Sequence, residues 1–227
     1  MSRWVEVFTG AYASGKSETA INRALSLYRK GDPIVLVDLD TVEPAYTLRP
    51  IKKELEKLGL TVVAHDRDNS FGLGEAGTYI TPEQKMCLHR KENLIIDVGY
   101  GSGGIDTLTI LEEIHDEPNL SIYMVINPNK FETSTPENII EHVNWSTEGQ
   151  KIKWKLTGFI CNPHFSDQTE IQDIFKGYEI VKKASIKANI PIRALNVHKS
   201  LINEFNKTNF KETEIWEIER FMPNALW

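Results

Sequence analysis

Residues 10–17, Gly-Ala-Tyr-Ala-Ser-Gly-Lys-Ser, combine glycines, a lysine and a hydroxyl in the pattern G-x-x-x-x-G-K-[ST]. In this pattern backbone N–H groups point at phosphate oxygens, the lysine adds a positive charge, and the final hydroxyl ligates magnesium. An apolar run precedes the segment and helical spacing follows it, which is the context that the chemistry requires. Lys16 is expected to take part in catalysis and Ser17 to hold Mg²⁺. The expected nucleotide-binding residues here are Gly10, Ala13, Ser14, Gly15, Lys16 and Ser17.

Three acidic residues end two apolar runs further along the chain. Leu-Ile-Ile-Asp closes at Asp97, and Val-Leu-Val-Asp-Leu-Asp closes with Asp38 and Asp40, two positions apart and so on one side of an extended chain. Ligands of open α/β sheets bind beyond the carboxyl ends of the strands, so these acids should meet the loop at 10–17. Asp97 would hold magnesium, and of Asp38 and Asp40 one would touch magnesium and the other orient water. The alternative for each acid is a turn or a helix cap.

The elements that must position these residues alternate as strand and helix, which predicts a mostly parallel, twisted α/β sheet of about seven strands between two layers of helices. Strands are predicted at 4–9, 34–38, 61–64, 94–97, 122–126, 157–161 and 192–195. Helices are predicted at 16–30, 51–58, 82–90, 105–115, 136–147 and 171–188, with a closing helix in the tail at 207–227. No linker or repeat divides the chain, so one domain, 1–227, is expected. Glu6 is unexplained inside the first strand.

Composition narrows the function classes. The 227 residues are 41% hydrophobic and 26% charged, which is ordinary for a globular protein. A net charge of -6 disfavours a broad nucleic-acid surface, so no nucleic acid is expected as a partner. The two cysteines have neither disulfide nor zinc spacing, and the six histidines lack metal-ligand spacing. No uncharged apolar run approaches the roughly 18 residues of a membrane span, so a cytoplasmic protein is expected.

With these motifs the sequence resembles the SIMIBI class of P-loop NTPases, in particular the CobQ/CobB/MinD/ParA nucleotide-binding family. The resemblance covers most of the chain and rests on the loop at 10–17, on 35–44, on Asp-Val-Gly-Tyr-Gly at 97–101 and on Gly-Phe-Ile-Cys-Asn at 158–162. It implies a nucleotide-sandwich homodimer, with Asp40 near the attacking water and Asn162 at the base edge. On that basis Asp40 is the catalytic acid, and Asp38 joins Ser17 and Asp97 as a metal ligand.

The chain departs from these relatives at Ala11, where many of them carry a lysine that reaches the partner's phosphates. Trans activation through that charge is therefore not expected, and the loop is closer to those of SIMIBI metallochaperone GTPases, which end in G-S-G-K-T. Guanine-specific relatives use N-K-x-D, whereas residues 129–132 read Asn-Lys-Phe-Glu. We therefore expect ATP and Mg²⁺ as cofactors, with GTP as the alternative.

Two glycine-rich segments suggest other cofactors. Residues 97–103 fit the D-x-G-x-G-x-G loop of S-adenosylmethionine-dependent methyltransferases, but the next predicted strand ends at Asn127 instead of an acid. A switch segment after Asp97 that responds to the γ-phosphate explains the same glycines. Residues 72–77 fit G-x-G-x-x-G, but no helix follows them, so a flexible loop near the site is the preferred interpretation.

Three functional hypotheses remain open. The first is a magnesium-dependent ATPase switch whose loops at 43–49 and 99–104 report the phosphate state to a client protein. The second is a nucleotide sensor or metallocentre-maturation accessory with little turnover, favoured by Ala11. The third is a small-molecule kinase, for which the sequence offers no arginine-rich lid.

Overall fold

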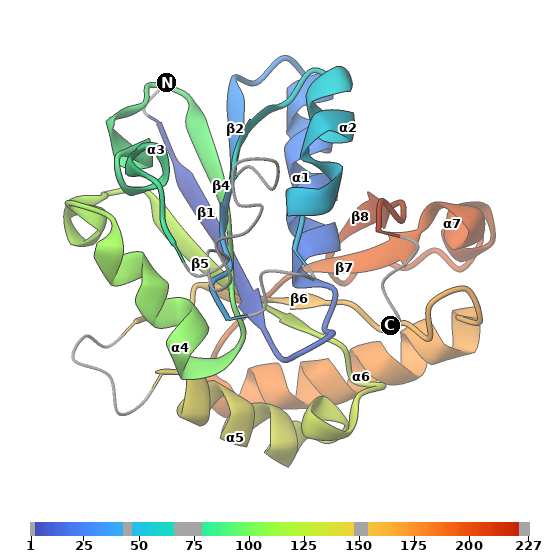
Figure 1. The fold of residues 1–227 in the computed structure, drawn as a ribbon. Coiled ribbons are helices and arrows are strands. Elements are labelled where there is room, and N and C mark those ends of the chain that lie inside the picture. The colour runs from blue at the N-terminus through green and yellow to red at the C-terminus, as the bar shows by residue number, and fades with distance from the viewer. Residues whose placement is uncertain (1–2, 43–46, 66–78, 148–153, 223–227) are drawn as a thin grey trace.

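A computed structural model describes residues 3–42, 47–65, 79–147 and 154–222. They form an eight-stranded sheet in the order β3-β2-β4-β1-β5-β6-β7-β8, and every paired neighbour is parallel. Helices cover both faces of the sheet (Figure 1). The predicted three-layer α/β architecture is confirmed. None of the helices in the described part of the chain is long and apolar enough to cross a membrane.

All seven predicted strands are present and an eighth is added. Their bounds are β1 Val5–Gly10, β2 Ile34–Leu39, β3 Thr61–Val63, β4 Asn93–Val98, β5 Leu120–Ile126, β6 Gly158–Cys161, β7 Ile192–His198 and β8 Glu214–Ile218. Every residue of β1 and β2 is buried, because helices cover both faces of a parallel sheet.

The helices divide between the two faces. Their bounds are α1 Lys16–Arg29, α2 Lys52–Lys57, α3 Pro82–Lys85, α4 Gly101–Asp106, α5 Pro136–Thr147, α6 Ile171–Ala188 and α7 Lys199–Asn206. On one face α1 and α2 pack against Phe8, Leu36 and Ile95 of the central strands. On the other face α4, α5 and α6 pack against a core that includes Val7 and Ile96. The alternation of buried apolar side chains along each strand thus builds two cores.

The closing helix predicted at 207–227 is wrong. The last helix, α7, ends at Asn206, before this segment begins. Residues Glu214–Ile218 pair with β7 as the edge strand β8. Trp216 is buried while its neighbour Glu217 is exposed, the alternation of a strand. Pairing with β7 also satisfies backbone groups that a short helix would leave to water.

The helix predicted at 105–115 is also wrong. The α-helix starts earlier, at Gly101, and gives way to 3₁₀ turns at Thr107–Ile110 and Ile114–Asp116. The Thr107 hydroxyl donates to the carbonyl of Gly104 at 2.6 Å, and such side-chain bonds compete with the helical ladder. Glu113 then takes a left-handed φ of 65°. Similarly, the helix predicted at 82–90 ends at Lys85 and is followed by the 3₁₀ turn Cys87–His89.

The structure explains Glu6. Its carboxylate accepts from Arg23 Nε at 2.8 Å and from Nη2 at 2.9 Å, a two-point contact between β1 and α1. The guanidinium also lies 4.4 Å from the ring centroid of Trp216. Because both charged side chains are about 10% exposed, the pair ties the central strand to α1 and to the edge strand β8.

Replacing Arg23 by methionine is expected to destabilise the fold, because Glu6 would stay buried without its partner. Loss of one member of a buried pair costs on the order of 3 kcal/mol. Denaturant unfolding would measure this cost. The double variant Glu6→Leu/Arg23→Met should recover most of it, and equal losses in the single and double variants would contradict the pairing argument.

Candidate functional site

The loop that joins β1 to α1 adopts a conformation that depends on its glycines. Gly15 has a left-handed φ of 85°, and a Cβ there would overlap the side-chain amide of Asn162. A Cβ on Gly10 would lie 2.5 Å from the carbonyl oxygen of Val125. The loop then opens directly into α1 at Lys16, so the helix N-terminus faces the loop. This is the strand, loop and helix arrangement of a phosphate site.

Lys16 forms an ion pair with Asp40, one of the three acids predicted to lie at the site. Its Nζ lies 3.1 Å from Asp40 Oδ2, and the lysine side chain is 11% exposed. Burial opposes the charge of Lys16, but the attraction of Asp40 and Asp97 outweighs it and raises the lysine pKa. The structure therefore brings the loop lysine and Asp40 together, and an incoming phosphate would compete with Asp40 for this ammonium group.

Asp97 lies at the end of β4 in the centre of the site. Strand register places it beside Phe8 of β1 on one side and Asp38 of β2 on the other. The residue is fully buried, and neither carboxylate oxygen has a partner in good hydrogen-bond geometry, although the Ser17 hydroxyl lies close enough to favour its charge. Burial raises the pKa of Asp97 to about 8, against the opposing effects of Lys16 and the nearby Ser17 hydroxyl. A buried acid without a partner is costly unless a ligand meets it.

The donors at this point fit Mg²⁺. Asp97 and the buried hydroxyl of Ser17 are oxygen ligands, and Mg²⁺ is commonly held by one or two such groups together with substrate phosphates. The described residues hold no cluster of three or more His, Cys, Asp or Glu side chains suited to a metal on their own. The donor set therefore suits a cation that arrives with phosphate oxygens.

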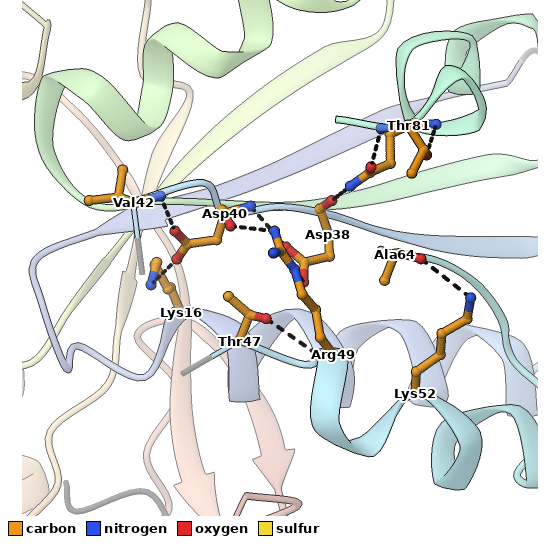
Figure 2. A network of polar contacts seen from close by, with 10 residues as sticks. Lys16, Asp38, Asp40, Val42, Thr47, Arg49, Lys52, Ala64 and Thr81 are labelled. Carbon is orange, nitrogen blue, oxygen red and sulfur yellow. Dashed lines mark hydrogen bonds and ion pairs between the residues drawn. The ribbon is translucent and has the colours of Figure 1, made fainter. Parts of the chain in front are cut away.

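Asp38 was expected to bind magnesium, and in the structure it is paired with Arg49. Its Oδ2 lies 2.9 Å from Nε of Arg49, and its Oδ1 accepts the backbone N–H of Asp40 at 2.9 Å. Arg49 begins the 3₁₀ turn Arg49–Ile51 and is nearly buried. Figure 2 shows its guanidinium between Asp38 and Asp40, with Asp40 turned towards Lys16. Arg49 was not among the predicted site residues, because no local pattern in the sequence links it to Asp38, eleven positions earlier.

The segments after β2 and β4 contact each other through Gly99. A Cβ on Gly99 would lie 2.6 Å from Val42 Cγ2 and 2.9 Å from Asp40 Oδ1, so no larger residue fits. The hydroxyl of Thr9 in β1 donates to the carbonyl of Gly99 at 3.2 Å. The segment predicted to respond to phosphate at 99–104 thus meets Asp40 and Val42, which precede the other such segment, 43–49; residues 43–46 of that segment lie outside the described residues.

A pocket opens beside the first turn of α1, on the side away from β2. Its lining includes Gly15 and Glu18, the ends of β6 and β7, and residues after β8. Asn162 lies there, but its amide donates to the carbonyl of Ser14 at 2.8 Å and its oxygen accepts from Asn196 at 3.1 Å. The structure thus gives Asn162 a role in supporting the loop, and its contact with a base stays a prediction.

Two lining residues were absent from the sequence analysis. The Oδ1 atom of Asn196 and the Nε2 atom of His164 are buried without hydrogen-bond partners. Burial lowers the pKa of His164 to about 4, so its ring is neutral at neutral pH. His164 follows the end of β6 and Asn196 lies in the carboxyl-terminal half of β7, and such a position near a strand end is a signal that sequence inspection could have used. Glu132 does not line this pocket, and the glycine motif at 72–77 lies outside the described residues.

Comparison with known proteins identifies the fold but no family. No family model and no curated protein matches the sequence. Among solved structures, the signal recognition particle receptor FtsY of Elizabethkingia anophelis in complex with GDP is 16% identical, with a TM-score of 0.56 over 87% of this chain and 57% of that one. FtsY of Thermotoga maritima is 17% identical, with a TM-score of 0.53 over 86% and 62%. FlhF complexed with GTP and Mg²⁺ is 14% identical, with a TM-score of 0.50 over 85% and 64%.

This chain has the P-loop NTPase fold. It spans less than two thirds of the length of each of these neighbours. At 14–17% identity these structures show the fold alone, and the SIMIBI class expected from the sequence stays a prediction. The narrower resemblance to CobQ, MinD and ParA proteins stays a prediction.

Proposed function

We propose that this chain is a magnesium-dependent nucleotide switch that hydrolyses a nucleoside triphosphate to the diphosphate and phosphate. The observation that carries the proposal is the juxtaposition of Lys16, paired with Asp40, and the unpartnered carboxylate of Asp97 at the mouth of the loop. Buried carboxylates in folded proteins usually have a hydrogen-bond partner, so a carboxylate of this kind beside the loop lysine points to a ligand.

The chain's own residues then have distinct tasks. Backbone N–H groups of the loop and Lys16 bind the phosphates, and Ser17 and Asp97 would hold Mg²⁺, which would neutralise charge on the phosphate oxygens. As the phosphates draw Lys16 away, the Asp40 oxygen that met the ammonium group can accept a hydrogen bond from the attacking water. Asp38, paired with Arg49, acts in this proposal as a support for Asp40 and replaces the ligand role expected from the sequence.

For the base we propose adenine, with guanine as the second candidate. Guanine presents N–H donors that a carboxylate reads well. Among the described lining residues, the carboxylate of Glu18 is engaged by the backbone N–H groups of Phe221 and Met222, and Glu219 is paired with Lys199. The acceptor of Asn196 instead suits an exocyclic amine. The second candidate, GTP, is supported by the neighbours that were crystallised with GDP or GTP.

The proposed client protein and the homodimer would both bind near the phosphates. Three exposed apolar side chains gather around residues 99–101: Val42 against Gly99, Tyr12 against Tyr100 and Trp145 against Gly101. Apolar side chains exposed together often mark a protein-binding surface. Their contact with the segment after Asp97 would make binding sensitive to the phosphate state.

The cytoplasm is the proposed location.

Calorimetric titration with ATP, GTP and S-adenosylmethionine, each with Mg²⁺, tests the function. Tight ATP binding followed by phosphate release is the expected result. Binding without release would favour the sensor or maturation accessory, and release from GTP alone would move the specificity to guanine. Binding of S-adenosylmethionine alone would overturn the proposal in favour of a methyltransferase.

Replacing Asp40 by asparagine is expected to separate binding from turnover. Without the competing carboxylate, Lys16 is free for the phosphates, so nucleotide affinity should stay equal or rise. Turnover should fall by about 100-fold or more, the usual contribution of a positioned acid or base. Single-turnover phosphate release together with a binding titration would measure both. Unchanged turnover would remove Asp40 from the mechanism.

A further inference from the structure

Arg49 forms a buried ion pair with Asp38 beside the phosphate loop at residues 10–17. Its side chain is 5% exposed, and the carboxylate that it meets, on Asp38, is fully buried. Buried ion pairs of this kind contribute little to stability compared with apolar packing, so they are often retained for another reason. The location of this pair, at the end of the strand that carries Asp40, suggests what that reason is (Figure 2).

The contacts of Arg49 fix the backbone of Asp40. Nη2 of Arg49 donates to the Asp40 carbonyl at 2.6 Å, while Nε holds Asp38. Asp38 in turn accepts the Asp40 N–H at 2.9 Å. Both polar groups of the Asp40 backbone are therefore bound, directly or through Asp38, to one guanidinium. Asp38 is held further by Gln84, whose side-chain amide donates to its carbonyl.

The side chain of Asp40 depends on this backbone anchor. In this structure its oxygens meet Lys16 and the N–H of Val42, at 3.1 and 3.0 Å. When phosphates draw Lys16 away, the carboxylate loses one partner, and the backbone anchor and the N–H of Val42 continue to hold its direction. A water-positioning group that moves by about 1 Å can cost about 100-fold in rate.

We propose that Arg49 is a positioning residue that holds Asp40 in its water-orienting direction while Lys16 changes partner, an inference that rests on the proposed hydrolysis. A guanidinium suits this task because its planar fork serves Asp38 and the Asp40 carbonyl at once. The single ammonium of a lysine lacks that geometry.

Arg49→Lys tests the proposal, because it keeps the charge opposite Asp38 and loses the fork. Turnover is expected to fall by about 10- to 100-fold, with the nucleotide dissociation constant within about twofold of wild type. Arg23→Lys is the matched control, since it makes the same change in the buried pair with Glu6, outside the site. Equal turnover in Arg49→Lys and wild type, or an equal loss in the control, would overturn the proposal.

A second measurement does not need turnover. Hydrogen exchange at the Val42 amide reports the direction of the Asp40 side chain that accepts it, and Arg49 does not bond to that amide. Exchange should quicken in Arg49→Lys and stay unchanged in Arg23→Lys. Unchanged exchange in Arg49→Lys would reject positioning by Arg49. If wild type releases no phosphate, the proposed hydrolysis fails, and exchange at Val42 still decides the role of Arg49.

Should Arg49→Lys fold poorly, the neutral pair Arg49→Gln/Asp38→Asn replaces it. This variant removes both buried charges together, so no unpaired charge is left behind. It too should lose turnover and retain nucleotide affinity, because an amide at position 49 cannot reproduce the guanidinium fork. Wild-type turnover in this variant would contradict the proposal.

Discussion

Lys16→Ala is expected to lower the affinity for Mg-nucleotide by about 30-fold or more, since loss of one charge-assisted partner of a buried anion costs roughly 2–5 kcal/mol. The ammonium is the loop's own cation, and Asp40, Asp38 and Asp97 surround it with negative charge. Without it, the phosphates would approach three carboxylates, and Arg49 would be the one cation left in the described part of this network.

Calorimetric titration would measure this loss, with Lys57→Ala as the control. Lys57 is an exposed lysine at the end of α2, so its removal should leave the affinity unchanged. Circular dichroism would establish that the Lys16 variant is folded, because removing a cation from buried carboxylates also affects stability. Wild-type affinity in a folded Lys16→Ala protein would reject the loop as the phosphate site.

Asp97→Asn is expected to change the pH dependence of stability as well as the response to magnesium. The pKa of Asp97 is raised from 3.8 to about 8 in the folded protein. Between these two pH values the folded state therefore keeps the Asp97 proton, whereas the unfolded state has already lost it. The stability contributed by this group is present at low pH and is lost as pH rises through about 8. Between those two pKa values the loss amounts to about 1.4 kcal/mol per pH unit.

Denaturant unfolding without nucleotide, at pH 6, 7 and 8, would measure this slope. The asparagine variant should lack the Asp97 contribution and should exceed wild type in stability at pH 8. Mg-nucleotide should raise the melting temperature of wild type and have little effect on the variant, because the metal ligand is gone. Parallel pH profiles for the two proteins would contradict the buried, unpartnered state of Asp97.

Together these results would assign separate tasks within one small network. Lys16 determines binding, Asp97 determines the dependence on magnesium and pH, and Asp40 determines turnover. Under the positioning proposal, a substitution of Arg49 lowers turnover and leaves nucleotide affinity unchanged. A protein in which all four substitutions lowered affinity equally would not be a switch with divided roles, and its site would need a different description.

The sequence determined the phosphate loop and the parallel strands. Residues 10–17 carry their geometry locally, since left-handed Gly15 and the helix that starts at Lys16 follow from neighbouring residues. Apolar runs ended by acids placed Asp38 and Asp97 at the same edge, because parallel strands share their direction. These features depend on short-range pattern and on a period of two, both of which are visible in the sequence.

Only the tertiary structure decided the rest. The segment Glu214–Ile218 has apolar residues that suit either a helix or a strand, and the open edge of β7 made it β8. Glu6 could be buried because Arg23 pairs with it from α1, and the ring of Trp216 in β8 lies against that guanidinium. The pairing of Asp38 with Arg49 and of Asp40 with Lys16 likewise depends on which charged groups a folded chain brings within 4 Å. Charge pairing between distant segments leaves no periodic pattern, so sequence inspection could name the acids but not their partners.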